Sequence, residues 1–174
     1  MTSPRVETTA VSEVEIPLVV FLLAGAEFGI DIKRVREIIR VSEITRMPKS
    51  PRFLEGIINL RGRIVSVLDL KKRFAFPACD LTMDSRVMVV EVGDQIVGLL
   101  VDKVSEVLKV PESNFSVPSG PILTIETQYL SGTAEMKKRL VVLLKLDRIF
   151  NLEQIKNLAD LEWSGANEER LDER

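Results

Sequence analysis

The 174-residue sequence predicts a mostly β protein made of two small β-barrels that are related by internal duplication. Three observations support this fold class. Two blocks of sequence recur in the same order, short runs rich in Val and Ile alternate with turn residues, and no segment has the pattern of a long helix. Four or five short strands per copy, with no helix to cover a sheet face, favour closure into barrels because closure removes exposed strand edges.

The duplication consists of two blocks. The first is FGIDIKRVREIIRV at residues 28–41, which recurs as VGLLVDKVSEVLKV at residues 97–110. The second is FLEGIINLRGRIVSVLDLKKRF at residues 53–74, which aligns without gaps with YLSGTAEMKKRLVVLLKLDRIF at residues 129–150. Two copies are too few for a solenoid, so the pattern predicts two copies of one folding unit. We expect intertwined subdomains at about residues 16–80 and 81–150.

Each copy is expected to begin with a β-hairpin. Strands at 18–23 and 28–32 flank Ala24-Gly25-Ala26, and strands at 87–92 and 96–101 flank Gly93-Asp94, a pair suited to positive φ. A second hairpin is expected from strands at 57–60 and 64–68, which flank Arg61-Gly62-Arg63. Its copy turns at Lys137 and Lys138 without a glycine.

Helices are expected to be short. Ile32, Val35, Ile38 and Ile39 have helical spacing, which suggests one or two turns after the second strand, although a strand fits these residues equally well. Asn151 can cap a C-terminal helix at 151–162, which we expect to pack on a barrel. Residues 1–15 and 163–174 have the composition of flexible or disordered tails.

The residue content argues against catalysis. The chain contains no histidine and one cysteine, Cys79, so Ser-His-Asp and Cys-His sites are excluded and no internal disulfide can form. No glycine-rich phosphate loop, calcium loop or other metal motif is present, and no cofactor is implied. These features predict a protein that is not an enzyme.

Charge and hydropathy restrict the partners. The net charge is -2, and the basic residues at 61, 63 and 71–73 have too few aromatic neighbours to predict nucleic-acid binding. We interpret them as a solvated barrel rim. The longest apolar run, residues 18–24, is far shorter than the roughly 20 residues of a membrane helix. With no export signal, we expect a protein of a reducing compartment that recognises its partners locally.

Four segments together resemble the CheW domain of bacterial chemosensory systems. They are GIDIKRVREII, MPKSPRFLEGIINLRGRIVSVLDLKKRF, RVMVVEVGDQIVGLLVDKVSEVLKVP and YLSGTAEMKKRLVVLLKLDRIF. The resemblance covers about residues 17–150, and the NLRG turn followed by a strand and DL makes it specific. It implies a non-catalytic adaptor with two SH3-like five-stranded β-barrels, which agrees with the duplication.

The resemblance also implies partners. Such an adaptor is cytoplasmic, joins membrane-associated chemoreceptor arrays and couples the cytoplasmic tip of a chemoreceptor to the regulatory domain of the histidine kinase CheA. Its receptor groove lies between the barrels, and the residues that would form it here are Val35, Glu37, Ile38, Arg61, Val87 and Met88. Apolar side chains would accept a receptor helix while Arg61 and Glu37 fix its register. For kinase binding at the outer barrel ends we expect exposed residues, namely Ile44, Val117 and Ile122.

Each of these assignments has an alternative. Val and Ile residues in a β protein belong more often to the core than to a binding site. Glu37 recurs as Glu106, and a structural ion pair in each copy explains both. For the whole protein, the alternative function is a CheW-like adaptor of a parallel chemosensory system, which binds the kinase regulatory domain but redirects or inhibits signalling.

Overall fold

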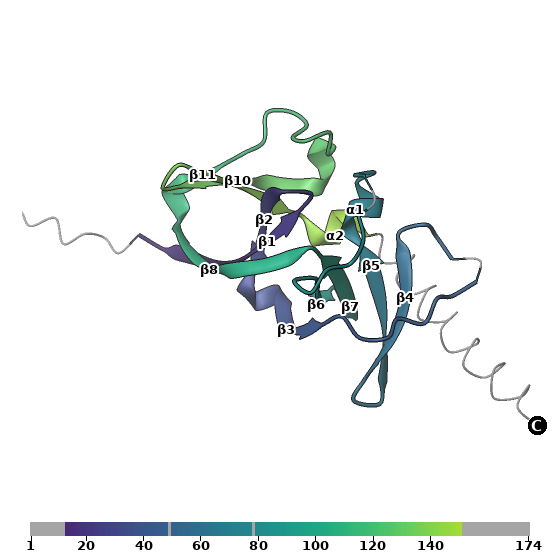
Figure 1. The fold of residues 1–174 in the computed structure, drawn as a ribbon. Coiled ribbons are helices and arrows are strands. Elements are labelled where there is room, and N and C mark those ends of the chain that lie inside the picture. The colour runs from purple at the N-terminus through teal and green to yellow at the C-terminus, as the bar shows by residue number, and fades with distance from the viewer. Residues whose placement is uncertain (1–12, 49, 78, 151–174) are drawn as a thin grey trace, which may run out of the picture.

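The computed structural model describes residues 13–48, 50–77 and 79–150 (Figure 1). The expected C-terminal helix at 151–162, the tail at 163–174 and most of the N-terminal tail lie outside these residues. The first strand begins at Glu15, the last residue of the expected N-terminal tail. Within the described residues, eleven strands form two sheets and the helices are short, so the mostly β prediction is confirmed.

One sheet, which we call barrel 1, has the strand order β8-β1-β2-β11-β10-β9. Its strands are β1 (Glu15–Leu23), β2 (Ala26–Asp31), β8 (Lys103–Pro111), β9 (Phe115–Ser116), β10 (Leu130–Met136) and β11 (Arg139–Leu144). The other sheet, barrel 2, has the order β3-β6-β7-β5-β4. Its strands are β3 (Val35–Arg40), β4 (Leu54–Leu60), β5 (Arg63–Asp69), β6 (Arg86–Val92) and β7 (Gln95–Val101).

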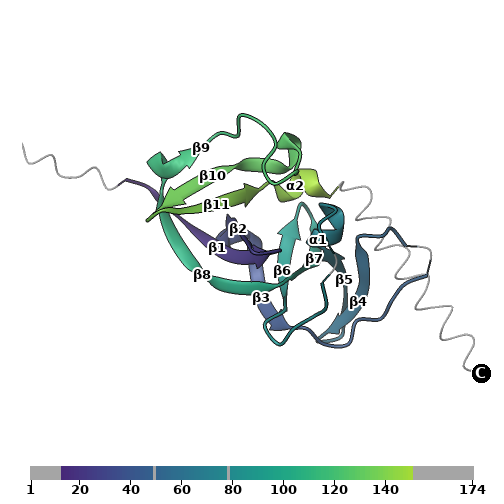
Figure 2. The same ribbon diagram turned by 45° about the horizontal axis from the view of Figure 1, so that its top comes forward.

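The two copies of the repeat exchange their first hairpins. The β1–β2 hairpin joins the strands of the second copy in barrel 1, and the β6–β7 hairpin joins those of the first copy in barrel 2 (Figure 2). Parallel pairs attach the exchanged hairpins, β2 to β11 and β7 to β5. A division near residue 80 therefore cuts through both sheets, and the barrels are built from both halves of the sequence.

The expected hairpins are confirmed as antiparallel pairs in the structure. In the β4–β5 turn, Arg61 and Gly62 have φ values of 52° and 83°, which is the two-residue turn that matches strand twist. Lys137 and Lys138 make the equivalent turn with φ values of 48° and 64°. Residues 32–40, for which helix and strand were both open, form a short 3-10 helix η1 (Ile32–Arg34) followed by β3.

Two equivalent glycines allow both barrels to close. After β3, Thr45 bridges to Ile57 of β4, and after β8, Ser116 of β9 pairs with Thr133 of β10. Gly56 and Gly132 lie beside these closures with φ values of 153° and 155°. A Cβ atom at Gly56 would lie 2.2 Å from the Thr45 carbonyl oxygen, and one at Gly132 would lie 2.4 Å from that of Ser116. A side chain is therefore excluded at the same place in each copy.

The described core divides into a large cluster between the barrels and a smaller one inside each barrel. Phe21 and Phe28 of barrel 1 meet Met88 and Leu99 of barrel 2 in the central cluster. Inside barrel 1 the buried residues are Leu18, Val20, Val110, Ala134, Val141 and Leu143. Inside barrel 2 they are Ile58, Val65, Val67, Val87 and Leu100. The hairpin strands are apolar on both faces because each face contacts a different cluster.

Two four-residue helices follow the equivalent strands β5 and β11, namely α1 (Leu70–Arg73) and α2 (Leu146–Ile149). Asp69 caps α1 by accepting hydrogen bonds from the backbone N–H groups of Lys71 and Lys72, and burial raises the pKa of its carboxyl group. The helices contact each other where Arg73 donates from Nε to the carbonyl of Ile149 at 3.0 Å. No helix in the described part of the chain is long and apolar enough to cross a membrane.

An ion pair between the buried Lys71 and the half-buried Asp102 also connects the two barrels at their junction. Lys71 Nζ lies 2.6 Å from Asp102 Oδ1, and Asp102 Oδ2 accepts a hydrogen bond from the Ala24 backbone N–H at 2.8 Å. Burial opposes the charge on Lys71, but the hydrogen bond and attraction from Asp102 outweigh it, so the pKa of Lys71 is raised. This contact holds α1, the end of β7 and the β1–β2 turn together.

Candidate functional site

One end of barrel 2 contains an open hollow of about 390 Å³. All strands of this barrel contribute to it. The residues that line it are Arg36, Glu37, Leu60, Arg61, Arg63, Val65, Val89 and Ile96. Apolar side chains and three arginines therefore share one small cavity, which we call the open end of barrel 2.

Arg61 and Glu37 are paired at this open end. The β4–β5 turn presents Arg61, whose side chain is 77 % exposed, and the Asn59 side chain stabilises the turn by accepting a hydrogen bond from the Gly62 N–H at 2.8 Å. Arg61 Nη2 lies 2.8 Å from Glu37 Oε2. The other carboxylate oxygen, Glu37 Oε1, is buried and has no hydrogen-bond donor among the described residues. Only one of the two carboxylate oxygens of Glu37 therefore has a hydrogen-bond donor among the described residues.

The other two arginines of the open end differ in their contacts. Arg36 is paired with Glu91, with Nε 2.6 Å from the carboxylate oxygen. Arg63 is exposed and forms no ion pair with any residue that the structure describes. The open end therefore carries one guanidinium group that is available to another molecule.

The equivalent end of barrel 1 carries a network of three charged side chains, which we call the ion triad. Arg139 binds Glu27 through two hydrogen bonds, Nε–Oε2 at 3.1 Å and Nη2–Oε1 at 2.6 Å. Its third nitrogen, Nη1, lies 2.5 Å from Glu106 Oε1. The hydrogen bonds that Arg139 donates to Glu27 and, to a smaller extent, to Glu106 raise its pKa further above its usual range. The expected ion pairs of Glu37 and Glu106 are both confirmed. Glu37 pairs with Arg61 in a turn, whereas Glu106 pairs with Arg139 at the start of a strand.

The strand register shows that the two ends correspond residue by residue. Glu106 lies opposite Val20 in barrel 1, and Glu37 lies opposite the equivalent Val89 in barrel 2. The parallel pair Val142–Phe28 likewise corresponds to Ser66–Val97. Counting back along these strands, Arg63 takes the place of Arg139 and Ile96 takes the place of Glu27. The open end thus lacks the carboxylate that completes the ion triad.

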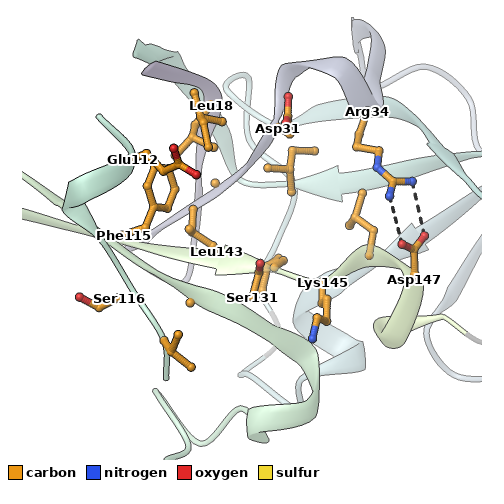
Figure 3. A pocket seen from close by; sticks show the side chains of 17 residues that line it. Leu18, Asp31, Arg34, Glu112, Phe115, Ser116, Ser131, Leu143, Lys145 and Asp147 are labelled. Carbon is orange, nitrogen blue, oxygen red and sulfur yellow. Dashed lines mark hydrogen bonds and ion pairs between the residues drawn. The ribbon is translucent and has the colours of Figure 1, made fainter. Parts of the chain in front are cut away.

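Barrel 1 has its own hollow, of about 460 Å³, at the end opposite the ion triad (Figure 3). Arg139 begins β11, whereas Leu143 and Leu144 at its other end line this hollow. Leu18, Leu143 and Phe115 lie on one side of it, and on the other side Arg34 Nη2 pairs with Asp147 Oδ2 at 3.1 Å (Figure 3). It therefore combines an apolar floor with a charged rim.

The residues expected to form a receptor groove between the barrels all belong to strands of barrel 2 or to its β4–β5 turn, and the hollow beside Glu37 and Arg61 is lined by barrel 2 alone. These residues fall into two groups. Glu37 and Arg61 are in direct contact at the open end of barrel 2, Ile38 is 41 % exposed on β3, and Val35 is half-buried against the central cluster. Val87 and Met88 are fully buried in the barrel 2 core and the central cluster, respectively. Neither side chain reaches the surface, so both are core residues in this structure.

The residues expected to bind the kinase are also divided. Val117 is 88 % exposed and lines the hollow of barrel 1. Ile44 and Ile122 are half-buried rather than exposed, because Ile44 packs on the barrel 2 core and Ile122 on the central cluster. All three residues were expected to be exposed. The structure agrees for Val117, whereas the expectation was wrong for Ile44 and Ile122.

In the described part of the chain, no group of three or more His, Cys, Asp or Glu residues is arranged to hold a metal ion.

The contrast between Arg63 with Ile96 and Arg139 with Glu27 was not predicted from the sequence. The signal was present, because Arg63 aligns with Arg139, and Ile96 lies one residue before a repeat block, as Glu27 does.

Comparisons with known proteins agree on one family. The family model of the CheW-like domain matches residues 17–154. The chain is 32 % identical to the chemotaxis protein CheW of Klebsiella aerogenes, over 78 % of this chain and 82 % of that protein. It is 34 % identical to a probable chemotaxis protein CheW of Rhizobium etli, over 77 % and 86 %. The crystal structure of the scaffolding protein TtCheW from Thermoanaerobacter tengcongensis is similar with a TM-score of 0.74 and 39 % identity, over 80 % of this chain and 90 % of that one.

Proposed function

Because the chain belongs to the CheW-like family of chemotaxis scaffold proteins, we propose that it is a non-catalytic adaptor that couples chemoreceptor signalling tips to the histidine kinase CheA. It acts in the cytoplasm, at receptor arrays on the membrane. Two separate partners require two separate surfaces. The open end of barrel 2 and the hollow of barrel 1 are two such surfaces, built from different strands.

The observation that carries the receptor assignment is the Arg61–Glu37 pair. Arg61 is largely exposed on a rigid two-residue turn, and its contact with Glu37 leaves one buried carboxylate oxygen without a donor. The adjacent Ile38 adds an exposed apolar side chain. An amphipathic receptor helix can bury its apolar residues on such a surface while polar groups at the pair set its register. Val87 and Met88 would contribute from below, as core residues that support β3.

Kinase binding is assigned to the hollow of barrel 1. Val117 is the most exposed of the three residues proposed for this contact, and it lines a hollow with an apolar floor. Burial of such an exposed apolar side chain against a partner removes apolar surface from water, which favours association. Ile44 and Ile122 would support the loops next to the contact.

The test is reconstitution of the purified protein with CheA and a receptor signalling fragment from the same organism, followed by kinase autophosphorylation. Arg61→Glu is compared with Lys137→Glu, which makes the same charge change at the equivalent turn of barrel 1. We expect wild type and Lys137→Glu to raise kinase activity in the presence of receptor. Arg61→Glu should lose this coupling and weaken receptor binding about tenfold or more, since it places two carboxylates together.

A third variant, Val117→Asp, should weaken binding to the kinase regulatory domain while receptor binding stays unchanged. Equal coupling by Arg61→Glu and Lys137→Glu would contradict the receptor assignment. If wild type binds the kinase but does not couple it to receptor, the protein is instead an adaptor that redirects or inhibits signalling.

A further inference from the structure

The open end of barrel 2 lacks one carboxylate that the ion triad has. Both ends have a glutamate on the strand that follows the exchanged hairpin, Glu37 or Glu106, and an arginine at the first residue of an inner strand, Arg63 or Arg139. In barrel 1 the third member is Glu27, and in barrel 2 the corresponding residue is Ile96. The duplication therefore provides an internal reference for what the open end lacks.

The charges at the open end favour an acidic occupant. Three arginines line it, and the contacts with Glu91 and Glu37 engage Arg36 and Arg61. Arg63 has no ion-pair partner among the residues that the structure describes. A guanidinium group next to an apolar wall binds a carboxylate more strongly than one in open solvent does, because the pair is partly desolvated.

The apolar part of the lining favours glutamate over a shorter acid. Ile96, Val65, Val89 and Leu60 surround the arginines. A glutamate side chain can place its two methylene groups on these residues and its carboxylate on Arg63, as Glu27 does with Arg139 in barrel 1.

The buried oxygen of Glu37 is explained by the same comparison. In barrel 1, Arg139 binds Glu27 with two of its nitrogens and donates from the third to Glu106. Glu37 is the counterpart of Glu106, and its Oε1 is buried without a donor in the described structure. An Arg63 side chain held in the orientation of Arg139 would provide that donor.

We propose that a glutamate side chain of the receptor tip enters the open end of barrel 2, binds Arg63 and completes there the triad that barrel 1 forms within its own chain. This inference rests on the proposed receptor-binding function and names the chemical group that the site recognises. Receptor binding then orders Arg63 between the incoming carboxylate and Glu37.

The experiment places the missing carboxylate in the chain itself. Ile96→Glu introduces at the open end the residue that barrel 1 has at the same register, and Ile96→Gln is the matched control of the same size without charge. Arg63→Gln removes the guanidinium group from an exposed position and leaves the fold intact. Binding of the purified receptor signalling fragment and, separately, of the purified kinase regulatory domain is measured by calorimetry for the full-length protein and each variant.

We expect Ile96→Glu and Arg63→Gln to weaken binding of the receptor fragment about tenfold, and Ile96→Gln to weaken it less than about threefold. Kinase-domain binding should be unchanged in all three. The receptor affinity of wild type should fall with added salt, and Arg63→Gln should reduce this dependence. Ile96→Glu should melt at or above the temperature of Ile96→Gln because it gains the internal ion pair.

Three results would overturn the inference. If Arg63→Gln and Ile96→Glu bind the fragment like wild type while Arg61→Glu does not, the receptor assignment stands and the glutamate subsite is rejected. If both Ile96 variants weaken binding equally and Arg63→Gln does not weaken it, the receptor recognises the shape of the open end and not the charge of Arg63. If wild type does not bind the fragment, the proposed function and this inference both fail. If Ile96→Glu does not fold, the result for Arg63→Gln decides. Receptor binding by Arg63→Gln that equals wild type rejects the glutamate subsite, and binding that is weaker and less dependent on salt supports it.

Discussion

The ion triad of barrel 1 and the open end of barrel 2 occupy equivalent places in the duplicated fold, yet the arginine is paired in the first and unpaired among the described residues in the second. Arg139 is held by Glu27 and Glu106, whereas Arg63 is exposed beside Ile96. The backbone register around both arginines is the same. The position of Glu27 is occupied by Ile96 in barrel 2, so the carboxylate that binds Arg139 through two hydrogen bonds has no counterpart beside Arg63. The duplication thus kept the scaffold while the charged groups at one end came to differ between the copies.

The largest loss of stability is expected when a feature that both barrels share is changed. Gly56→Ala would place a Cβ atom 2.2 Å from the Thr45 carbonyl oxygen and 2.7 Å from Ile44 Cγ2. We expect a loss of more than about 3 kcal/mol in the free energy of unfolding, because backbone that closes the barrel must move. Gly132→Ala should have a similar effect through Ser116. Urea unfolding of each variant measures it.

Gly25→Ala is the control for this pair of variants. Gly25 also has a positive φ, of 82°, but a Cβ atom there would meet nothing within 4 Å. It should lose only about 1 kcal/mol from backbone strain. Equal losses for all three variants would show that the close approach at Gly56 and Gly132 is not what excludes a side chain.

A smaller effect is expected when the residue that differs between the ends is exchanged. Glu27→Ile gives barrel 1 the residue of barrel 2 and removes two hydrogen bonds from Arg139. The Arg139 side chain is 35 % exposed, so solvent screening limits the loss to about 1 kcal/mol in the free energy of unfolding. Thermal unfolding at low and high salt measures the change, with Glu27→Gln as the control.

The salt dependence sharpens that test. If the triad stabilises barrel 1 by ionic contacts, the difference between wild type and Glu27→Ile should shrink at high salt. A variant as stable as wild type under both conditions would mean that the triad fills the barrel end without stabilising it.

Much of the fold was predictable because its signals are local. Alternating apolar runs and the Arg61-Gly62 turn define hairpins wherever they occur. Intertwined subdomains were expected, but the local pattern did not predict which hairpin joins which barrel. The β1 residues Val19 and Phe21 face the central cluster while Leu18 and Val20 face a barrel core, and this apolar pattern suits either sheet. Only long-range pairing decides between them.

The candidate site was predictable in part for a similar reason. The family resemblance identified Glu37 and Arg61, and the structure brings them together. It also suggested Val87 and Met88, whose burial depends on two layers of packing that residue type alone does not specify. The contrast between Ile96 and Glu27 needed the strand register, because a sequence alignment does not show which side chains face Arg63 or Arg139.

We propose that the receptor binds at the open end of barrel 2 and not at the ion triad of barrel 1. Hydrogen–deuterium exchange of the full-length protein with and without a receptor signalling fragment tests it within one molecule. We predict slower exchange in peptides that cover residues 36–38 and 60–65, with no change in the equivalent residues 105–107 and 136–141. Equal protection of both sets, or protection of the barrel 1 set alone, would contradict the claim.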